Sequence, residues 1–251
     1  MKKNVIIFFL FTVTPLYLFA QSETEDLTST SSNEAFFNAL NIYNNAIGRN
    51  SLIFTGGVYH DSQRGIKGHP FYMNDYWEIG TIVYEGQQYD SIEIKYNILR
   101  DLLIVKNIDK RGFIWPIQLN SLKVEEFNVM GHYFVNIEED TLSNVKNGFY
   151  DVLSDGAKAK VLIKRRKEIN ESQNMGRLEK EYDINDIWYI KSSQEYYIVK
   201  GKNSILKVLA DRKNEIKAFL RKNKERFRND HEKQLIDVVE YYNSISNNKG
   251  S

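Results

Sequence analysis

The residues best suited to chemistry gather in one glycine-rich stretch of the sequence. His60 and Asp61 are adjacent, His69 follows nine positions later, and Asp75 comes shortly after it. Imidazole and carboxylate groups serve as metal ligands and as acid/base groups, and loops on rigid sheets often carry function. The spacing places the two rings on no common helix or strand face and matches no established metal signature. Two interpretations stay open: a metal or acid/base site, or histidines that stabilise a turn.

The rest of the sequence assigns no reaction. The chain has no cysteine, which excludes a thiol nucleophile, thiolate zinc sites and iron–sulfur clusters. No nucleophile-elbow pattern surrounds a serine, and no phosphate-binding glycine loop precedes a helix. The acidic run 138–140 is interpreted as a solvated turn, and His132 and His231 as structural residues. We therefore assign no catalytic residue, no metal ligand and no cofactor, and the stretch from His60 to Asp75 supplies the remaining candidates.

The first twenty residues have the layout of a secretory signal peptide. Two lysines precede an apolar run from Val5 to Phe19, and Ala20 stands before a polar stretch. A proline breaks the run and no basic cluster follows it, which favours cleavage before Gln21 over a retained spanning helix. A lipoprotein anchor would need a cysteine. The sequence therefore predicts an exported protein, periplasmic or extracellular, in which residues 21–32 form a flexible polar leader.

Composition is that of an ordinary folded domain. Hydrophobic residues make up 42% and charged residues 27%, which fits neither a disordered nor a membrane-embedded chain. Residues 33–246 are long enough for one substantial domain, whose core no disulfide supports. The net charge of +1 gives no general attraction for nucleic acid. Two basic runs, Lys164–Lys167 and residues 213–228, are interpreted as solvated surface, with anionic lipid or polysaccharide as the alternative contact.

From Leu52 to Val199 the hydrophobic period is two, the spacing of half-buried strands. Turn signals recur about every 8–12 residues. The clearest are Glu85-Gly86 and Asp155-Gly156, each between two alternating runs. Leu102–Val105 is apolar on both faces, which predicts a strand covered on both sides. About ten short strands result, and we expect an antiparallel meander in the form of a sandwich or partly closed barrel.

Helical spacing occurs at both ends of the domain. Apolar residues recur every three or four positions over Asn33–Ile47, which predicts one N-terminal helix. A second stripe has Ser204 as its predicted N-cap, and a third helix is expected to begin at Asn229 or Asp230. Residues 247–251 are polar and are expected to fray. The predicted fold class is therefore α+β, a β meander with one N-terminal and two C-terminal helices.

Two blocks of the sequence resemble a pattern found in uncharacterised secreted β-rich bacterial proteins. The resemblance covers most of the chain after the expected signal peptide, and its residues are structural in type. It implies a secreted domain of strands with a two-helix ending, and it brings no activity, cofactor or site residue. The first block comprises Gly80, Val83, Tyr84, Gly86, Tyr89, Tyr96, Leu102, Val105 and Phe127, and the second Tyr196, Val199, Lys202, Leu206, Leu209, Lys217, Phe219 and Tyr241.

The absence of a catalytic signature in an exported, strand-rich chain favours a non-enzymatic binding protein. An envelope protein, a polysaccharide or a lipid is the expected partner, and nucleic acid is not. The many tyrosines and phenylalanines suit the wall of a ligand pocket, but cross-strand packing explains them more simply. The alternative function is a secreted hydrolase or metal-dependent enzyme that uses the loop from His60 to Asp75.

Overall fold

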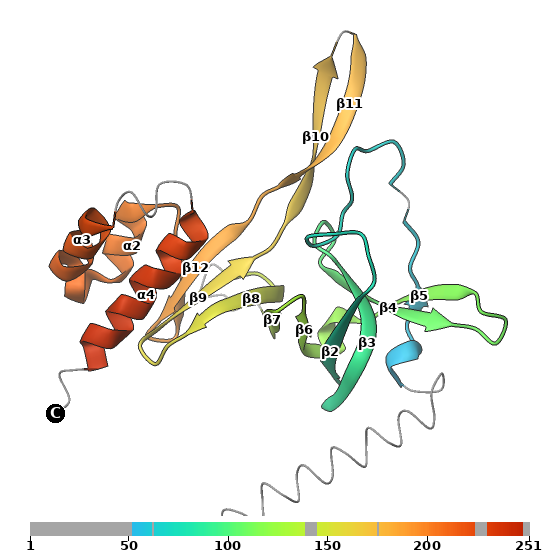
Figure 1. The fold of residues 1–251 in the computed structure, drawn as a ribbon, viewed down its shortest axis with the longest axis horizontal. Coiled ribbons are helices and arrows are strands. Elements are labelled where there is room, and N and C mark those ends of the chain that lie inside the picture. Colours follow the sequence, from blue (N-terminus) through green and yellow to red (C-terminus); the bar gives the residue numbers. More distant parts are fainter. Residues whose placement is uncertain (1–51, 62, 139–144, 175, 224–229, 248–251) are drawn as a thin grey trace, which may run out of the picture. The chain divides into compact units, whose positions relative to one another are not determined.

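One antiparallel sheet runs through most of the chain. The computed structural model describes residues 52–247 except 62, 139–144, 175 and 224–229, all within one compact unit. Eleven strands pair in the order β1-β5-β4-β3-β2-β6-β7-β8-β9-β12-β13 (Figure 1). The sheet does not close, because β1 and β13 lie at its two edges. The predicted α+β meander is confirmed, and the open sheet decides against a closed barrel.

The strands are short and most are joined by tight turns. In the main sheet they are β1 (Gly57–Val58), β2 (Glu78–Tyr84), β3 (Gln87–Asn97), β4 (Leu102–Ile108), β5 (Ile114–Gln118), β6 (Val124–Val129), β7 (His132–Ile137), β8 (Gly148–Asp155), β9 (Ala159–Lys164), β12 (Ile187–Ser192) and β13 (Glu195–Ile198). Both predicted turns are confirmed, since Glu85-Gly86 joins β2 to β3 and Asp155-Gly156 begins the turn from β8 to β9.

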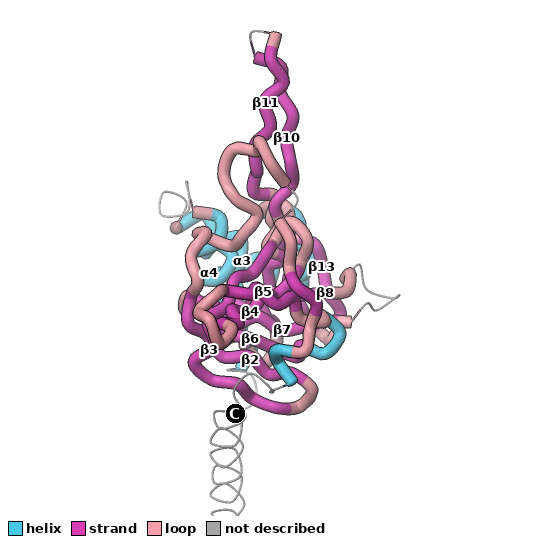
Figure 2. The backbone as a smooth tube through the Cα atoms, turned by 90° about the vertical axis from the view of Figure 1, so that its right-hand side faces the viewer, coloured by secondary structure: helices cyan, strands magenta, loops and turns pink. Residues whose placement is uncertain are grey.

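A second sheet consists of one long hairpin, β10 (Lys167–Asn174) and β11 (Arg177–Ile184). It continues the ladder between β9 and β12, because Asn185 N–H donates to Arg166 O at the junction. Figure 2 shows this ribbon running away from the rest of the strands. Strand β10 was not predicted, since it has no apolar alternation. Its partner β11 supplies the register along the whole strand.

Three helices follow the strands: α2 (Lys202–Val208), α3 (Lys213–Lys222) and α4 (His231–Asn247). The stripe that begins near Ser204 is divided by a 3₁₀ turn, η4 (Ala210–Arg212), into α2 and α3. Ser204 is not the N-cap, because its hydroxyl lies inside the first turn and accepts from Gly201 N–H at 3.1 Å. Asp230 does cap α4, accepting from Lys233 N–H at 2.9 Å. Two further 3₁₀ turns are η2 (Leu52–Phe54) and η3 (Ser121–Lys123).

Several predicted features lie outside the described residues. These are the signal peptide, the polar leader, the helix over Asn33–Ile47 and the residues after 247. Among the residues that are described, none of the helices has the length and apolar character needed to cross a membrane.

Aromatic rings fill the core beneath strands β2 to β8. Tyr96, Phe127, Phe134 and Phe149 are each at most 2% exposed, and their ring centroids lie 4.7–5.8 Å apart. Phe127 and Phe134 are direct cross-strand partners, the arrangement in which aromatic pairs stabilise a sheet. The interpretation of the aromatic content as cross-strand packing is confirmed for this core.

The helices cover one face of strands β8, β9 and β12. Their buried residues Leu209, Ile216 and Val238 pack in one cluster with Val161 and Ile190 of the sheet. The next residues along the strands face the other way, where another buried cluster comprises Val145, Tyr150, Leu162 and Tyr189. Both faces of β9 are therefore covered, as they are at Leu103–Val105, where the prediction from sequence is confirmed.

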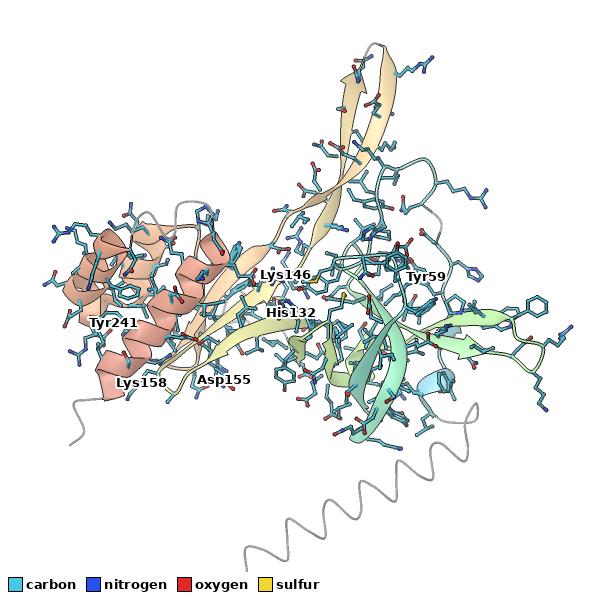
Figure 3. The ribbon with its side chains drawn as sticks, viewed as in Figure 1. Tyr59, His132, Lys146, Asp155, Lys158 and Tyr241 are labelled. Carbon is cyan, nitrogen blue, oxygen red and sulfur yellow. The ribbon has the colours of Figure 1, made fainter. Side chains whose placement is uncertain are left out.

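Asn243 fastens α4 to the start of β9. Its Oδ1 accepts from Lys158 N–H and Ala159 N–H, both at 3.0 Å, and its Nδ2 donates to Ala159 O at 2.9 Å. A side chain at Gly156 would put Cβ 1.9 Å from Asn243 Nδ2, so glycine is needed there for close approach. Asp155 and Lys158 lie beside the C-terminal half of α4 in Figure 3.

Replacing Asn243 by leucine tests this attachment. The variant removes the partner of the Lys158 N–H and of the buried N–H and carbonyl of Ala159, and we expect a loss of about 2–4 kcal/mol in the free energy of unfolding. Urea denaturation followed by circular dichroism measures it. Asn214→Leu is the matched control, because Asn214 is exposed on α3. Equal stability of the two variants would contradict the assignment.

Candidate functional site

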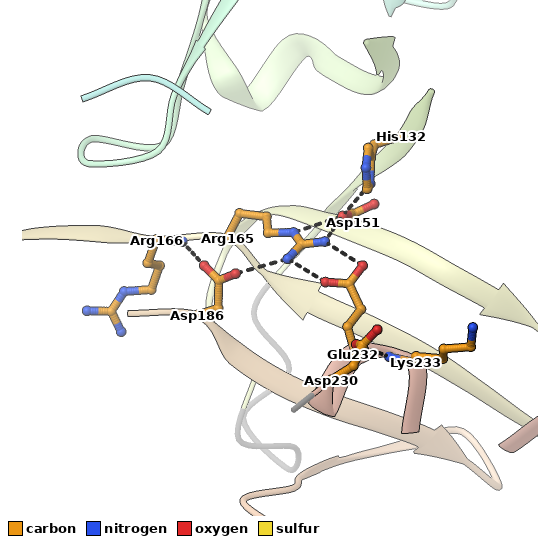
Figure 4. A network of polar contacts seen from close by, with 8 residues as sticks. All are labelled: His132, Asp151, Arg165, Arg166, Asp186, Asp230, Glu232 and Lys233. Carbon is orange, nitrogen blue, oxygen red and sulfur yellow. Dashed lines mark hydrogen bonds and ion pairs between the residues drawn. The ribbon is translucent and has the colours of Figure 1, made fainter. Parts of the chain in front are cut away.

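Arg165 lies where the main sheet passes into the β10–β11 ribbon. It follows β9 directly and is 7% exposed. A charged side chain buried to this degree needs partners of opposite charge. The guanidinium contacts three carboxylates from three parts of the chain (Figure 4): Asp151 in β8, Asp186 between β11 and β12, and Glu232 at the start of α4.

All three nitrogen atoms of the guanidinium contact a carboxylate. Arg165 Nε donates to Asp151 Oδ2 at 2.9 Å, and Nη1 donates to Asp186 Oδ2 and Glu232 Oε2, both at 3.0 Å. Nη2 lies 2.7 Å from Asp151 Oδ2 and donates to Glu232 Oε1 at 3.3 Å. Burial alone lowers the pKa of Arg165, but the hydrogen bonds to Glu232 and the nearby acidic groups raise it above its usual range. The planar fork of arginine suits this set in a way that lysine does not.

Asp151 is shared between Arg165 and a histidine. Its side chain is fully buried, and its Oδ2 lies 2.9 Å from His132 Nδ1. Its second oxygen, Oδ1, has no hydrogen-bond partner among the described residues. A buried carboxylate fixes the orientation of the histidine ring that it contacts, an arrangement found in acid/base sites and in structural clusters alike.

Tyr72 closes the other side of the cluster. Its ring lies under the guanidinium, with the Arg165 Cζ 5.6 Å from the centroid, and edge-on to His132 at 5.4 Å. Tyr72 is 5% exposed, yet its hydroxyl has no hydrogen-bond partner in the described part of the chain. Burial raises the pKa of Tyr72 far above its usual value, so the hydroxyl stays neutral. A buried hydroxyl without a partner is costly, and it marks a place where a ligand or water completes the structure.

A cavity of about 270 Å³ lies beside Tyr72 and Arg165. Part of its wall is apolar and part carries charged or titratable groups, the composition expected of small-molecule sites. The apolar part comprises Met73, Ile98 and Ile184 with the Tyr72 ring, and the polar part comprises His132, Lys167, Asp186 and Glu232 with Arg165.

Charged groups of both signs line the cavity. Two cations, Arg165 and Lys167, and two carboxylates, Asp186 and Glu232, belong to its lining. Asp151 is not part of the lining, but it is the third carboxylate that contacts the Arg165 guanidinium. The ammonium of Lys167 is already engaged, donating to the backbone oxygens of His69 and Phe71 at 2.8 and 2.7 Å. Burial lowers its pKa.

Two other cavities have no comparable group. One of about 150 Å³ lies between β12, α2 and α4 around Trp188 and Leu235. Another of about 320 Å³ lies at the turns around Lys158 and Lys191. None of the buried polar side-chain atoms that lack a partner in the described residues belongs to the lining of either cavity.

The four residues predicted from sequence lie along the loop that precedes β2. His60 and Asp61 are exposed, and Asp61 Oδ1 accepts from Gln63 N–H at 3.0 Å. Asp75 is also exposed and binds Lys95 Nζ at 2.6 Å. In the described ranges no three histidine, aspartate or glutamate side chains gather closely enough to hold a metal ion, so the structure does not unite the four candidates into such a group.

His69 is connected to the cavity wall through its backbone oxygen, which accepts from Lys167. Its Nδ1 accepts from Phe71 N–H at 3.2 Å, and its ring stacks on Phe71 with centroids 6.2 Å apart. Burial, and then the charge of Lys167, lower the pKa of His69. Its backbone oxygen receives the Lys167 ammonium, so this part of the loop supports the wall of the cavity without lining it.

Sequence reasoning missed the residues of the arginine cluster. The interpretation of Lys164–Lys167 as solvated surface is wrong for Lys164 and Arg165, which are 8% and 7% exposed. Lys164 Nζ donates to Asp101 Oδ2 at 2.5 Å, and Tyr96 donates to Asp101 Oδ1 at 2.6 Å. One signal was available, since the single carboxylate inside the apolar strand Gly148–Leu153 is Asp151. A charged residue in such a run needs a buried partner.

Comparisons of the chain with protein-family models, with curated proteins and with solved structures found no match.

Two tyrosine variants test whether the Tyr72 hydroxyl is unpartnered in the folded protein. Tyr72→Phe removes a buried group that no described residue satisfies, so we expect stability to stay within about 0.5 kcal/mol or to rise. Tyr96→Phe breaks a hydrogen bond to a carboxylate and should cost about 1.5–3 kcal/mol. Urea unfolding measures both. A loss of more than about 1 kcal/mol in Tyr72→Phe would show that the hydroxyl is already satisfied.

Proposed function

We propose that this chain is an exported binding protein without catalytic activity, and that the cavity beside Arg165 holds a small molecule with an ammonium or similar donor group. The observation that carries the proposal is Tyr72, a residue of the cavity lining whose buried hydroxyl lacks a hydrogen-bond partner among the described residues. A ligand that donates to this oxygen removes the cost of its burial.

The charge of the cluster supports the same ligand class. The carboxylates of Asp186 and Glu232 line the cavity and contact Arg165, and with Asp151 they place more negative charge around this guanidinium than it neutralises. A ligand cation placed near them neutralises that charge inside a partly buried site, where electrostatic interactions are stronger than in water. A ligand carboxylate would add to the excess.

The size of the cavity restricts the ligand to a small molecule. Its volume is about 270 Å³. That is close to the lower end of ordinary ligand pockets. The apolar wall of Met73, Ile98 and Ile184 suits a short hydrocarbon portion beside the donor group.

The groups at the cavity are better arranged for binding than for reaction. The raised pKa of Tyr72 keeps its hydroxyl neutral, so it is no base at neutral pH. The carboxylates are bound to Arg165, which restrains them in place. An enzyme that uses the loop from His60 to Asp75 is the alternative proposal, although Asp61, His69 and Asp75 already bond to groups of the protein.

Binding of three matched four-carbon probes tests the proposal. Butylammonium, butyrate and 1-butanol share a hydrocarbon portion and differ in charge and in donors. We expect butylammonium to bind the chain most tightly in isothermal titration calorimetry and to raise its melting temperature, because only this probe neutralises the excess charge. In Tyr72→Phe its affinity should fall about 3–10-fold through loss of one hydrogen bond.

Tyr76→Phe is the control for this experiment, because Tyr76 is 73% exposed and lies outside the cavity lining. The proposal fails if butylammonium does not bind, if butyrate binds more tightly, or if the two tyrosine variants bind butylammonium equally well. Turnover of an ester, peptide or glycoside that is lost in His60→Ala/His69→Ala would instead support the enzyme.

A further inference from the structure

The β4–β5 hairpin reaches beyond its neighbours in the sheet. Strand β3 pairs with β4 only as far as Val105, and β1 pairs with β5 no further out than Ile117. The outer ladder pairs Asn107–Trp115 and Ile108–Ile114 therefore have no strand on either side among the described residues (Figure 1). We refer to residues 107–115 as the β4–β5 tip.

The tip exposes large apolar side chains. Ile108 is 39% exposed, Phe113 61%, Ile114 50% and Trp115 47%. A single exposed apolar side chain on a protein surface is ordinary and needs no explanation. Four of them lie in one short hairpin, and such a concentration of exposed apolar side chains marks a site of interaction.

Both faces of the tip are apolar. Ile108 and Ile114 are direct cross-strand partners and share one face. Trp115 is the next residue in the strand, so its side chain points to the opposite face. A flat protein surface could cover only one of these faces. A medium that surrounds the ribbon, such as the headgroup region of a bilayer, covers both.

The turn at the end of the tip presents cations outward. Lys110 and Arg111 are exposed. The carboxylate of Asp109 is instead directed into the turn, where Oδ1 accepts from Arg111 N–H at 2.8 Å and Phe113 N–H at 3.0 Å. Its Oδ2 accepts from Trp115 Nε1 at 3.4 Å and lies 3.9 Å from Arg111 Nε. The tip carries one net positive charge, and tryptophan next to lysine and arginine is typical of membrane interfaces.

The other two-stranded ribbon shows that a projecting hairpin does not need this composition. Residues 170–174 of β10 are Asn, Glu, Ser, Gln and Asn, and Glu171 bonds to Lys180 across the ribbon. Leu178 is the exposed large apolar side chain in the outer half of that ribbon among the described residues. The apolar surface of the β4–β5 tip is therefore a property of this hairpin and not of ribbons in general.

We propose that the β4–β5 tip inserts into the headgroup region of an anionic membrane, with Lys110 and Arg111 at the lipid phosphates and the four apolar side chains at the edge of the hydrocarbon. Interfacial elements of this kind reach about 5–10 Å into the bilayer surface. The ribbon rises about 3.3 Å per residue, so the length of the tip matches that depth. The inference stands apart from the ligand proposed for the cavity.

Vesicle binding of the full chain tests this inference. We expect co-sedimentation with vesicles of phosphatidylcholine plus phosphatidylglycerol to exceed that with phosphatidylcholine alone. Phe113→Ser/Trp115→Ser and Lys110→Glu/Arg111→Glu should each reduce the partition coefficient about tenfold or more. Every variant keeps the same first 51 residues, and these contain no tryptophan. A blue shift of tryptophan emission on vesicle binding that is lost in Trp115→Phe therefore reports on the tip alone.

Two variants serve as matched controls. Leu122→Ser removes an apolar side chain that is 81% exposed elsewhere, and Lys213→Glu/Lys217→Glu reverses two exposed cations on α3. Both should bind vesicles as the unmodified chain does. The inference is overturned if neither vesicle type binds, if the tip variants bind like these controls, or if only the α3 variant loses binding. Capture of a protein partner through Phe113 and Trp115 without vesicle binding would likewise overturn it.

Discussion

The structure depends on the neutralisation of one buried guanidinium. Removing an ion from water costs several kcal/mol, and the charge is tolerated only where carboxylates surround it with good geometry. Arg165 meets this condition through residues 14, 21 and 67 positions away in the chain. The three carboxylates come from β8, the junction of β11 with β12, and the start of α4. The ion pairs of this one side chain therefore fix where the β10–β11 ribbon leaves the main sheet and where α4 contacts that sheet.

The preceding residue places a second buried cation next to the first. Lys164 bonds to Asp101, which also receives the hydroxyl of Tyr96 from the aromatic core. Burial lowers the pKa of Lys164, and the Asp101 carboxylate opposes that shift. Gly148 is needed beside this pair, because a Cβ there would lie 1.8 Å from Asp101 Oδ2. Two consecutive residues thus link β9 to the N-terminal strands, the C-terminal helix and the ribbon.

Elements whose structure depends on local sequence patterns were predictable from sequence, whereas the cluster of Arg165 and its three carboxylates was not. Alternation and turn residues suffice for the β2–β3 and β8–β9 hairpins, because each depends on neighbours in sequence. Strand β10 has no such pattern and takes its structure from β11. Arg165 looked like part of a solvated basic run because its partners are distant in sequence. Only Asp151, a charge inside an apolar strand, indicated in advance that a buried ion pair was required.

The central claim is that Arg165 and its carboxylates act as one unit that joins α4 to the sheet. A double-mutant cycle between Arg165→Met and Glu232→Gln, measured by urea unfolding, tests it most directly. We expect Arg165→Met alone to cost about 3–5 kcal/mol, and the cost to be smaller by at least about 1.5 kcal/mol when Glu232 is already glutamine. Two effects that add within about 0.5 kcal/mol would show no coupling and would contradict the account.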